Sequence, residues 1–212
     1  MNNNTQNKVD QPVVHIVDDD EAVRDSLSML LDSVGIKNAN YPSAQVFLDS
    51  HQVTQLKSQA GCIVLDIRMP DMSGIECQQR LAELKCTLPI IFITGHGDIP
   101  MAVETMKRGA LEFIQKPFRE QQLLDCIQAA LQLSISNHSE SLYSNEISTR
   151  LLSLTEREKQ VMQGVISGQA NKVIAVEMNI SQRTVEIHRA NVMEKMQAKT
   201  LAELVKLVLT QD

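Results

Sequence analysis

The stretch "VVHIVDDDEAVRD" (residues 13–25) runs from an apolar, mostly β-branched segment into four consecutive acids. The apolar part has the composition of a buried strand. The apolar spacing from Glu21 to Val34 predicts a helix. Four adjacent carboxylates repel one another, so their place between strand and helix needs an explanation. They either cap the helix from a solvated loop or hold a cation, and the remaining sequence discriminates between the two.

The same alternation of strand and helix continues through the first two thirds of the chain. Apolar runs predict strands at residues 13–17, 36–41, 61–67, 89–94 and 110–115. Helical patterns follow them at residues 21–34, 43–52, 73–84, 98–109 and 119–133. Uniformly apolar strands separated by helices are typical of a parallel sheet that is covered on both faces. The expected fold is therefore α/β, a doubly wound five-stranded parallel sheet.

Composition narrows the class of protein. A hydrophobic fraction of 43% in 212 residues supports packed cores and argues against global disorder. No apolar run is long enough to cross a membrane, and the polar segment 1–11 reads as a disordered tail and lacks the apolar part of a secretion signal. The four cysteines are scattered, without zinc-site spacing, and read as small buried hydrophobes. The expected location is the cytoplasm.

A second domain is predicted after a serine- and asparagine-rich linker at 134–150, "SISNHSESLYSNEISTR". Residues 151–212 carry no strand signal and read as a small all-helical domain. Thr155 and Glu158 have capping-box spacing, Asn179 marks a turn, and Ser181 caps a helix that reaches Met196. This part has a net charge of +1 and the part before it −7, which suggests different partners for the two.

Polar residues stand at the carboxyl ends of the predicted strands, where doubly wound sheets bind ligands. They are Asp18 and Asp19, Asp66, Thr94 and Lys116. Carboxylates suit Mg²⁺, a carboxylate can attack phosphorus, and a lysine can neutralise the transferring oxygens. Each residue alone is a weak signal, because an Asp at a strand end is more often a turn former. Their joint placement points to phosphoryl transfer.

Four segments, "IVDDDEAVRDSL", "IVLDIRMPDMSGIE", "PIIFITGHGD" and "GALEFIQKPF", together resemble the receiver domain of two-component response regulators across residues 12–133. The resemblance implies a flavodoxin-like fold. It implies that Asp66 is the phosphoacceptor and that Asp18, Asp19, Asp66 and the Arg68 carbonyl bind Mg²⁺. It also implies that Thr94 and Lys116 bind the phosphoryl group and that Phe113 is the switch aromatic. Asp20 and Glu21 belong instead to the helix start, where acids are favourable.

Residues 151–209 are similar to the helix-turn-helix domain of LuxR/FixJ-type regulators, most specifically in "TVEIHRANVMEKM". A two-helix unit with a tight turn can place its second helix in the major groove of DNA. The expected DNA contacts are Lys172, Arg183, Thr184, Glu186, Arg189, Asn191 and Lys195. Glu186 is expected to accept from cytosine, Arg189 to pair with guanine or with phosphate, and Lys172 and Lys195 to contact phosphates. By charge alone, a solvated helix of mixed charge is the better interpretation, since +1 is far from strongly basic.

These features predict a transcriptional response regulator that a partner histidine kinase phosphorylates at Asp66. The phosphorylated form is expected to dimerise, bind promoter DNA and activate transcription by RNA polymerase. Beyond its own phosphorylation and dephosphorylation the chain is not expected to be an enzyme. Two alternatives stay open. A Mg²⁺-dependent phosphatase should carry a second acid two residues after the nucleophile, where this chain has Arg68; a phosphate-independent regulator would use the first domain only for dimerisation.

Overall fold

The computed structural model describes residues 11–50, 56, 59–95 and 99–209. The predicted tail 1–11 lies outside the described residues except for its last member. The chain divides into two compact units, with the boundary between His138 and Ser139. In the part of the chain that is described, no helix is both long and apolar enough to cross a membrane.

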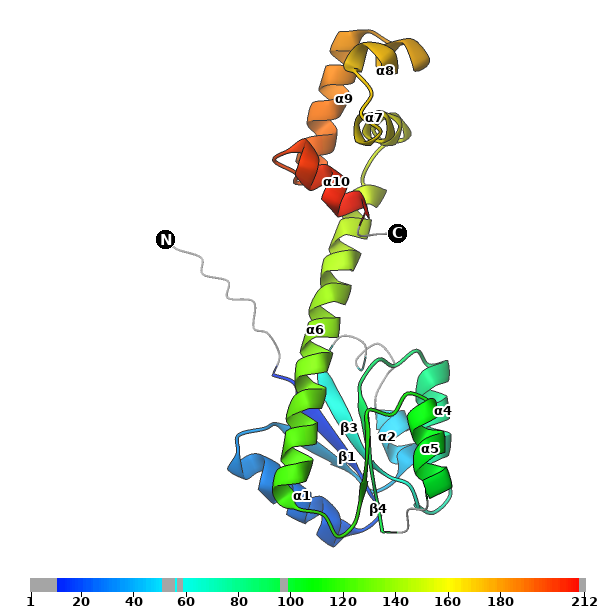
Figure 1. The fold of residues 1–212 in the computed structure, drawn as a ribbon, viewed down its shortest axis with the longest axis vertical. Coiled ribbons are helices and arrows are strands. Elements are labelled where there is room, and N and C mark those ends of the chain that lie inside the picture. Colours follow the sequence, from blue (N-terminus) through cyan, green and yellow to red (C-terminus); the bar gives the residue numbers. More distant parts are fainter. Residues whose placement is uncertain (1–10, 51–55, 57–58, 96–98, 210–212) are drawn as a thin grey trace. The chain divides into compact units, whose positions relative to one another are not determined.

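The first unit is built on a five-stranded sheet (Figure 1). Its strands pair in parallel in the order β2-β1-β3-β4-β5. They are β1 Val13–Val17, β2 Asn38–Tyr41, β3 Gly61–Asp66, β4 Ile90–Thr94 and β5 Glu112–Gln115. Because all five are parallel, their carboxyl ends share one edge of the sheet. The parallel sheet predicted from the apolar runs is confirmed.

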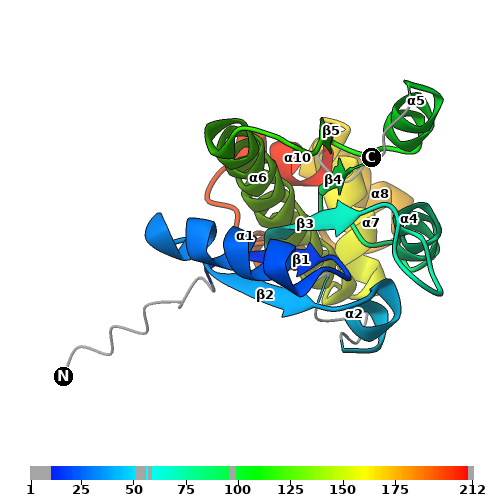
Figure 2. The same ribbon diagram turned by 90° about the horizontal axis from the view of Figure 1, so that it is seen from below.

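Helices cover both faces of this sheet (Figure 2). On one face α1 (Glu21–Ser33) and the first part of α6 (Glu120–Leu152) pack over β-strand side chains such as Val64 and Ile91. The other face is covered by α2 Ala44–Ser50, α4 Gly74–Glu83 and α5 Ile99–Lys107. Two separate apolar cores result, as a doubly wound fold requires.

The sequence predicts that the helix after β5 ends near residue 133. In the structure this helix, α6, continues without a break through the predicted linker 134–150 and ends at Leu152. The segment contains no glycine or proline to interrupt it, and packing fixes it on both sides of the boundary. In the first unit the Ser134 hydroxyl accepts a hydrogen bond from the Gly61 amide at 3.0 Å; in the second unit Ile147 is buried in the core. The linker residues are therefore helical.

The second unit is all-helical, as predicted. It consists of the last turns of α6 and of α7 Glu156–Ile166, α8 Asn171–Glu177, α9 Gln182–Lys195 and α10 Leu201–Leu209. Thr155 and Glu158 form the predicted capping box, and Ser181 caps α9 by accepting from the Thr184 amide. Asn179 adopts the left-handed conformation, with φ of 52°, in the turn between α8 and α9. The predicted inward stripe of α9 is buried: Val185, Val192 and Met196.

Candidate functional site

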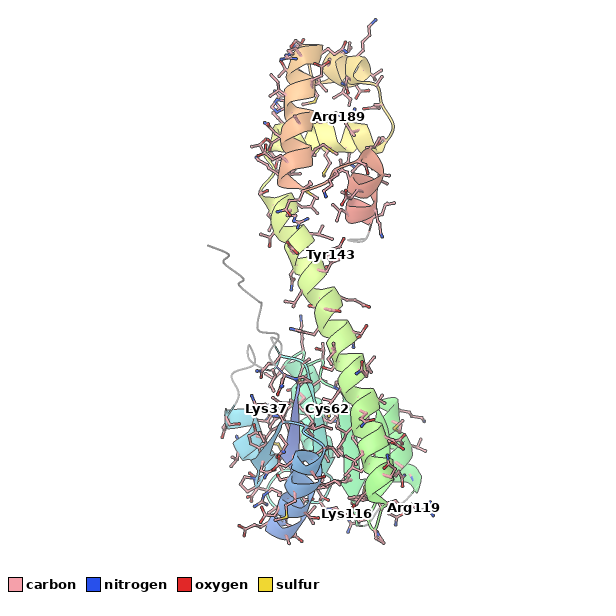
Figure 3. All side chains as sticks on the ribbon, turned by 90° about the vertical axis from the view of Figure 1, so that its left-hand side faces the viewer. Lys37, Cys62, Lys116, Arg119, Tyr143 and Arg189 are labelled. Carbon is pink, nitrogen blue, oxygen red and sulfur yellow. The ribbon has the colours of Figure 1, made fainter. Side chains whose placement is uncertain are left out.

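Two carboxylates and one ammonium meet where β1, β3 and β5 end. The Lys116 Nζ lies 2.7 Å from Asp18 Oδ2 and 3.2 Å from Asp66 Oδ1. Both aspartates are almost fully buried, whereas Lys116, labelled in Figure 3, keeps part of its side chain exposed. Three of the five polar strand-end residues predicted from the sequence thus form one cluster.

The local backbone holds Asp66 in place. Its Oδ2 accepts a hydrogen bond from the Arg68 amide at 2.7 Å, which leaves Oδ1 for Lys116. The first residue of α4, Gly74, packs directly on the backbone of Asp66, and a β-carbon there would clash with the Asp66 carbonyl. Ser73 caps α4 in a capping box with Glu76. The sequence "DMSG" therefore brings the start of α4 close against the backbone of Asp66.

The four acids of the opening stretch have different roles. Asp18 accepts from the Asp20 amide at 2.9 Å, and its carbonyl accepts from Arg24 Nη1 at 2.7 Å. Asp20 is the N-cap of α1, because its carboxylate accepts from the amides of Ala22 and Val23. Asp19 is exposed. The capping explanation holds for Asp20, whereas Asp18 faces the cluster with Lys116, where the predicted cation site stays a prediction.

Burial and charge act against each other at this cluster. Burial raises the pKa of Asp66, and the neighbouring Asp18 charge adds to the rise, while Lys116 opposes it. Burial alone would lower the pKa of Lys116, but the hydrogen bonds and charges of Asp18 and Asp66 outweigh it and raise that pKa. A single ammonium therefore offsets two buried carboxylates, and the cluster favours a further cation.

The donor set fits Mg²⁺, which takes one or two protein carboxylates together with waters and phosphate oxygens. Asp18 and Asp66 supply two converging carboxylates, and the exposed Asp19 adjoins Asp18 in the chain. Within the described ranges, no three His, Cys, Asp or Glu side chains lie close enough together to hold a metal ion. The predicted ligand set is thus brought together only in part, with Lys116 between its two buried members.

Two further predicted site residues, Thr94 and Phe113, lie on β4 and β5. Thr94 is the last residue of β4 and is 1% exposed, and it pairs in register with Gln115 of β5. Phe113 is half-buried on β5 and packs against the core beneath α5. The Thr94 hydroxyl and the Phe113 ring therefore belong to β4 and β5, the two strands that follow β3 in the order of the sheet.

In the second unit, α9 presents part of the predicted contact set to solvent. Arg183 and Glu186 are exposed and form an ion pair of 3.7 Å. Lys172 is exposed on α8, and Asn191 is half-buried. The Thr184 hydroxyl lies 2.8 Å from that of Ser181, so it takes part in the helix cap.

Two predicted contacts are engaged within the unit itself. Arg189, labelled in Figure 3, donates through Nη1 to Asn171 Oδ1 at 3.1 Å and ties α9 to α8. Lys195 donates to the Glu158 carboxylate at 2.7 Å and to the Ser153 carbonyl at 3.2 Å. The sequence interpretation did not foresee either bond, although Glu158 was already placed in a capping box.

One residue of the exposed face was missed. Ile187 is 51% exposed on α9 and shares the helix face of Arg183. Val185 and Val192 of the same helix are buried. In the sequence, Ile187 could be recognised as an apolar residue outside the inward stripe that contains those two valines. Single exposed apolar residues are common on protein surfaces, so exposure by itself gives Ile187 no role.

Comparisons with known proteins agree with both units. The response regulator receiver domain matches residues 14–128, and the luxR family of bacterial regulatory proteins matches residues 152–208. The chain belongs to the two-component response regulators with a LuxR-type helix-turn-helix domain. Such a regulator implies a histidine kinase and DNA as partners, and its relatives include transcriptional regulatory proteins.

Two curated relatives span nearly the whole chain. The transcriptional regulatory protein FixJ of Bradyrhizobium diazoefficiens is 44% identical over 92% of this chain and 94% of its own length. The response regulator protein TodT of Pseudomonas putida F1 is 45% identical over 92% of this chain and 84% of its own.

Solved structures give the same result. The response regulator StyR is 46% identical with a TM-score of 0.88, over 94% of this chain and 98% of that one. Full-length FixJ from B. japonicum is 44% identical with a TM-score of 0.56, over 94% and 97%.

Proposed function

We propose that Asp66 accepts a phosphoryl group from the phosphohistidine of a partner kinase and that this controls DNA binding by the second unit. The observation that carries the proposal is the cluster in which Lys116 bridges Asp18 and Asp66. A buried carboxylate beside a cation is equipped to act as a nucleophile toward phosphorus.

In the proposed step an Asp66 carboxylate oxygen forms a bond to phosphorus as the bond from phosphorus to the histidine nitrogen breaks. Lys116 neutralises charge on one phosphoryl oxygen, and the Thr94 hydroxyl donates to another. Asp18, Asp19, Asp66 and the Arg68 carbonyl would hold Mg²⁺. When bound, this ion neutralises charge on the transferring oxygens. Arg68 stands where a hydrolase of this chemistry would need an acid, which favours a long-lived acyl phosphate over turnover.

The switch proposed for the phosphorylated form runs from Thr94 to Phe113. When the Thr94 hydroxyl turns toward the phosphoryl group, Phe113 gains room to turn inward and the surface of α5 and β5 changes. On α5, Val103 and Met106 are 45% and 43% exposed, and such apolar residues can pair with a second copy. We propose that phosphorylation promotes a homodimer through this face.

The output we propose is activation of transcription at a promoter, with RNA polymerase as a further partner. In this proposal α9 enters the major groove, and Arg183, Thr184, Glu186 and Asn191 face the bases with Ile187 added to the set. Lys172 is a phosphate contact. Arg189 and Lys195 are also predicted DNA contacts. Arg189 must break its bond to Asn171, and Lys195 its bond to Glu158, before either side chain can reach DNA.

The experiment compares Asp66→Asn with Asp20→Asn in the full chain. Asparagine caps helices as well as aspartate does, so Asp20→Asn should fold and react normally. With acetyl phosphate and Mg²⁺, the wild type and Asp20→Asn should gain the mass of one phosphoryl group and bind promoter DNA more tightly, and Asp66→Asn should do neither. Phosphorylation of Asp66→Asn at the wild-type level would refute the proposal.

A further inference from the structure

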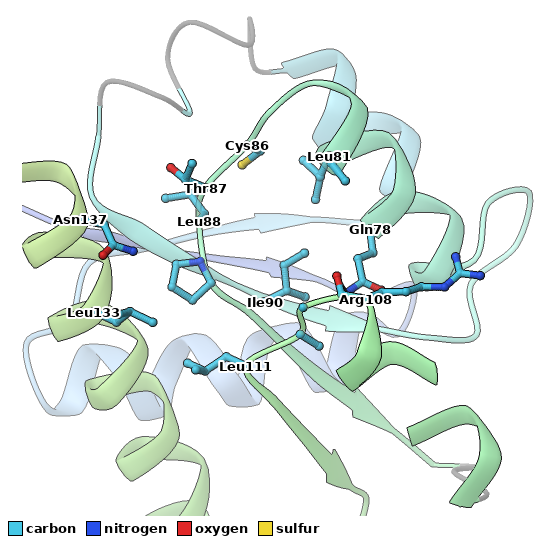
Figure 4. Close-up of a pocket in the computed structure, with 14 residues that line it drawn as sticks. Gln78, Leu81, Cys86, Thr87, Leu88, Ile90, Arg108, Leu111, Leu133 and Asn137 are labelled. Carbon is cyan, nitrogen blue, oxygen red and sulfur yellow. Dashed lines mark hydrogen bonds between the residues drawn. The ribbon is translucent and has the colours of Figure 1, made fainter. Parts of the chain in front are cut away.

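A cavity of about 380 Å³ opens at the edge of the sheet opposite the phosphoryl site. Its walls come from α4, from residues 86–90 before and at the start of β4, from residues 108–111 before β5, and from α6 (Figure 4). Most of the lining is apolar, including Leu81, Leu88, Ile90, Ala110, Leu111 and Leu133. The volume lies within the range of small-molecule sites in proteins.

One polar side chain in this lining is incompletely satisfied. Gln78 is 4% exposed and extends from α4 towards Arg108 (Figure 4). Its amide nitrogen donates to the carbonyls of Thr105 and Arg108, both at 3.3 Å, so the other end of the group must be the oxygen. That oxygen, Oε1, has no hydrogen-bond partner among the described residues. A buried acceptor left without a donor is destabilising, because it has lost its hydrogen bonds to water.

Gln78 is one of the residues that line the cavity, so a molecule bound there can offer the missing donor to Oε1. The terminal torsion of glutamine is broad, which allows the amide to adjust to such a molecule. Arg108 is the only charged side chain in the described lining, and Glu104 already pairs with it at 2.6 Å. The described lining is therefore largely apolar, with Gln78 Oε1 as an acceptor that has no partner, with the polar side chains of Thr87 and Asn137, and with its charged residue Arg108 already paired.

We propose that this cavity binds an uncharged amphipathic small molecule whose apolar ring or chain fills the lining and whose hydroxyl or N–H group donates to Gln78 Oε1. The site is separate from phosphoryl transfer and from DNA reading. Because Gln78 also holds the carbonyls of Thr105 and Arg108, the occupant acts on the C-terminal end of α5. Backbone amides 105–111 are therefore the ones that should respond to it.

The probes are benzyl alcohol and benzyl methyl ether, which share an apolar body and differ in the hydrogen-bond donor. Each is titrated into the isotopically labelled full chain, and amide chemical shifts are followed by NMR. Benzyl alcohol should shift amides 105–111 and 87–90 saturably, and the ether should bind about tenfold more weakly, the ratio expected for one unmet acceptor. No saturable shift at these amides, or equal affinity for the two probes, would overturn the proposal.

Substitutions at Gln78 and Ala82 test the hydrogen-bond acceptor and the cavity volume separately. Gln78→Met should bring the two probe affinities within about twofold of each other, because the substitution removes the Oε1 acceptor of residue 78. Ala82→Phe should fill the cavity from its rim and abolish both titrations, whereas Glu83→Phe, on the adjacent exposed position outside the lining, should bind as the wild type does. Retained preference for the alcohol in Gln78→Met contradicts the proposal. If Gln78→Met does not fold, the wild-type probe pair and Ala82→Phe decide.

Discussion

The Lys195 ammonium lies 2.7 Å from the Glu158 carboxylate and joins the last turn of α9 to the first turn of α7. Glu158 is nearly buried and also accepts from the Thr155 amide at 2.8 Å as part of the capping box. Hydrogen bonds lower the pKa of Glu158 to about 2. The bond from Lys195 has the largest effect, and the bond from the Thr155 amide follows. One carboxylate thus stabilises the start of α7 and fixes the end of α9.

The ion pair should make the second unit sensitive to acid. Because the folded-state pKa of Glu158 lies below its ordinary value of 4.5, its contribution to stability is complete above that value and is lost as pH falls towards 2. Glu158→Gln should lower the free energy of unfolding of this unit by roughly 1–3 kcal/mol at neutral pH. The difference from wild type should shrink between pH 4.5 and pH 2. Urea midpoints of α7 and α9 amide signals in the full chain measure both effects.

Glu156→Gln is the matched control. Glu156 forms an ion pair of 2.8 Å with Lys159, but its side chain is 84% exposed, so its loss should cost at most about 0.5 kcal/mol. Equal losses in the two variants, or a Glu158→Gln difference that does not change with pH, would show that the buried pair contributes no more than a surface one.

A second prediction concerns competition between Lys116 and Mg²⁺ at the acid cluster. Lys116→Met leaves Asp18 and Asp66 without their counter-charge, so the variant should be less stable without metal by roughly 3 kcal/mol. Mg²⁺ should then raise its unfolding temperature more than that of the wild type, because the ion replaces the lost charge. Lys107→Met on the exposed face of α5 is the control. An identical Mg²⁺ effect in all three proteins would mean that Lys116 does not compete with the ion.

The sheet and the acid cluster could be predicted because short segments of the sequence carry the information for both. The three central strands β1, β3 and β4 are mostly apolar and buried throughout, and parallel strands bring their carboxyl ends to one edge. The course of α6 could not be predicted in this way, because serines and asparagines have weak intrinsic helix preference. That segment is helical because Ser134 and Ile147 are fixed by tertiary contacts on either side of it. The bonds of Arg189 and Lys195 were missed for the same reason, since both partners are distant in sequence.

Arg150 should act as a positioning residue for α9. Its Nη1 donates to the carbonyl of Met196 at 3.2 Å, where α9 ends, and its Nη2 pairs with Glu146 at 2.7 Å. A cation at a helix C-terminus is favourable, and here it satisfies one of the last free carbonyls. Arg150→Met should therefore destabilise the second unit by roughly 1–3 kcal/mol, with the loss of amide protection centred on the end of α9. Arg157→Met, exposed on α7, should change little; equal loss in both would reject the assignment.

The last prediction separates residues that read bases from those that bind phosphate. Ile187 is apolar and exposed beside Arg183 and Glu186, and thymine presents a methyl group in the major groove. Ile187→Ala should relax the preference at one base pair at a cost of about 1 kcal/mol and leave the salt dependence unchanged. Lys172→Ala should weaken binding to all sites alike and reduce the salt slope by about 1. Binding to a set of single-base operator variants at several salt concentrations measures both, and Val176→Ala, exposed on α8, is the apolar control. If Ile187→Ala lowers affinity equally for every operator variant, Ile187 does not read sequence.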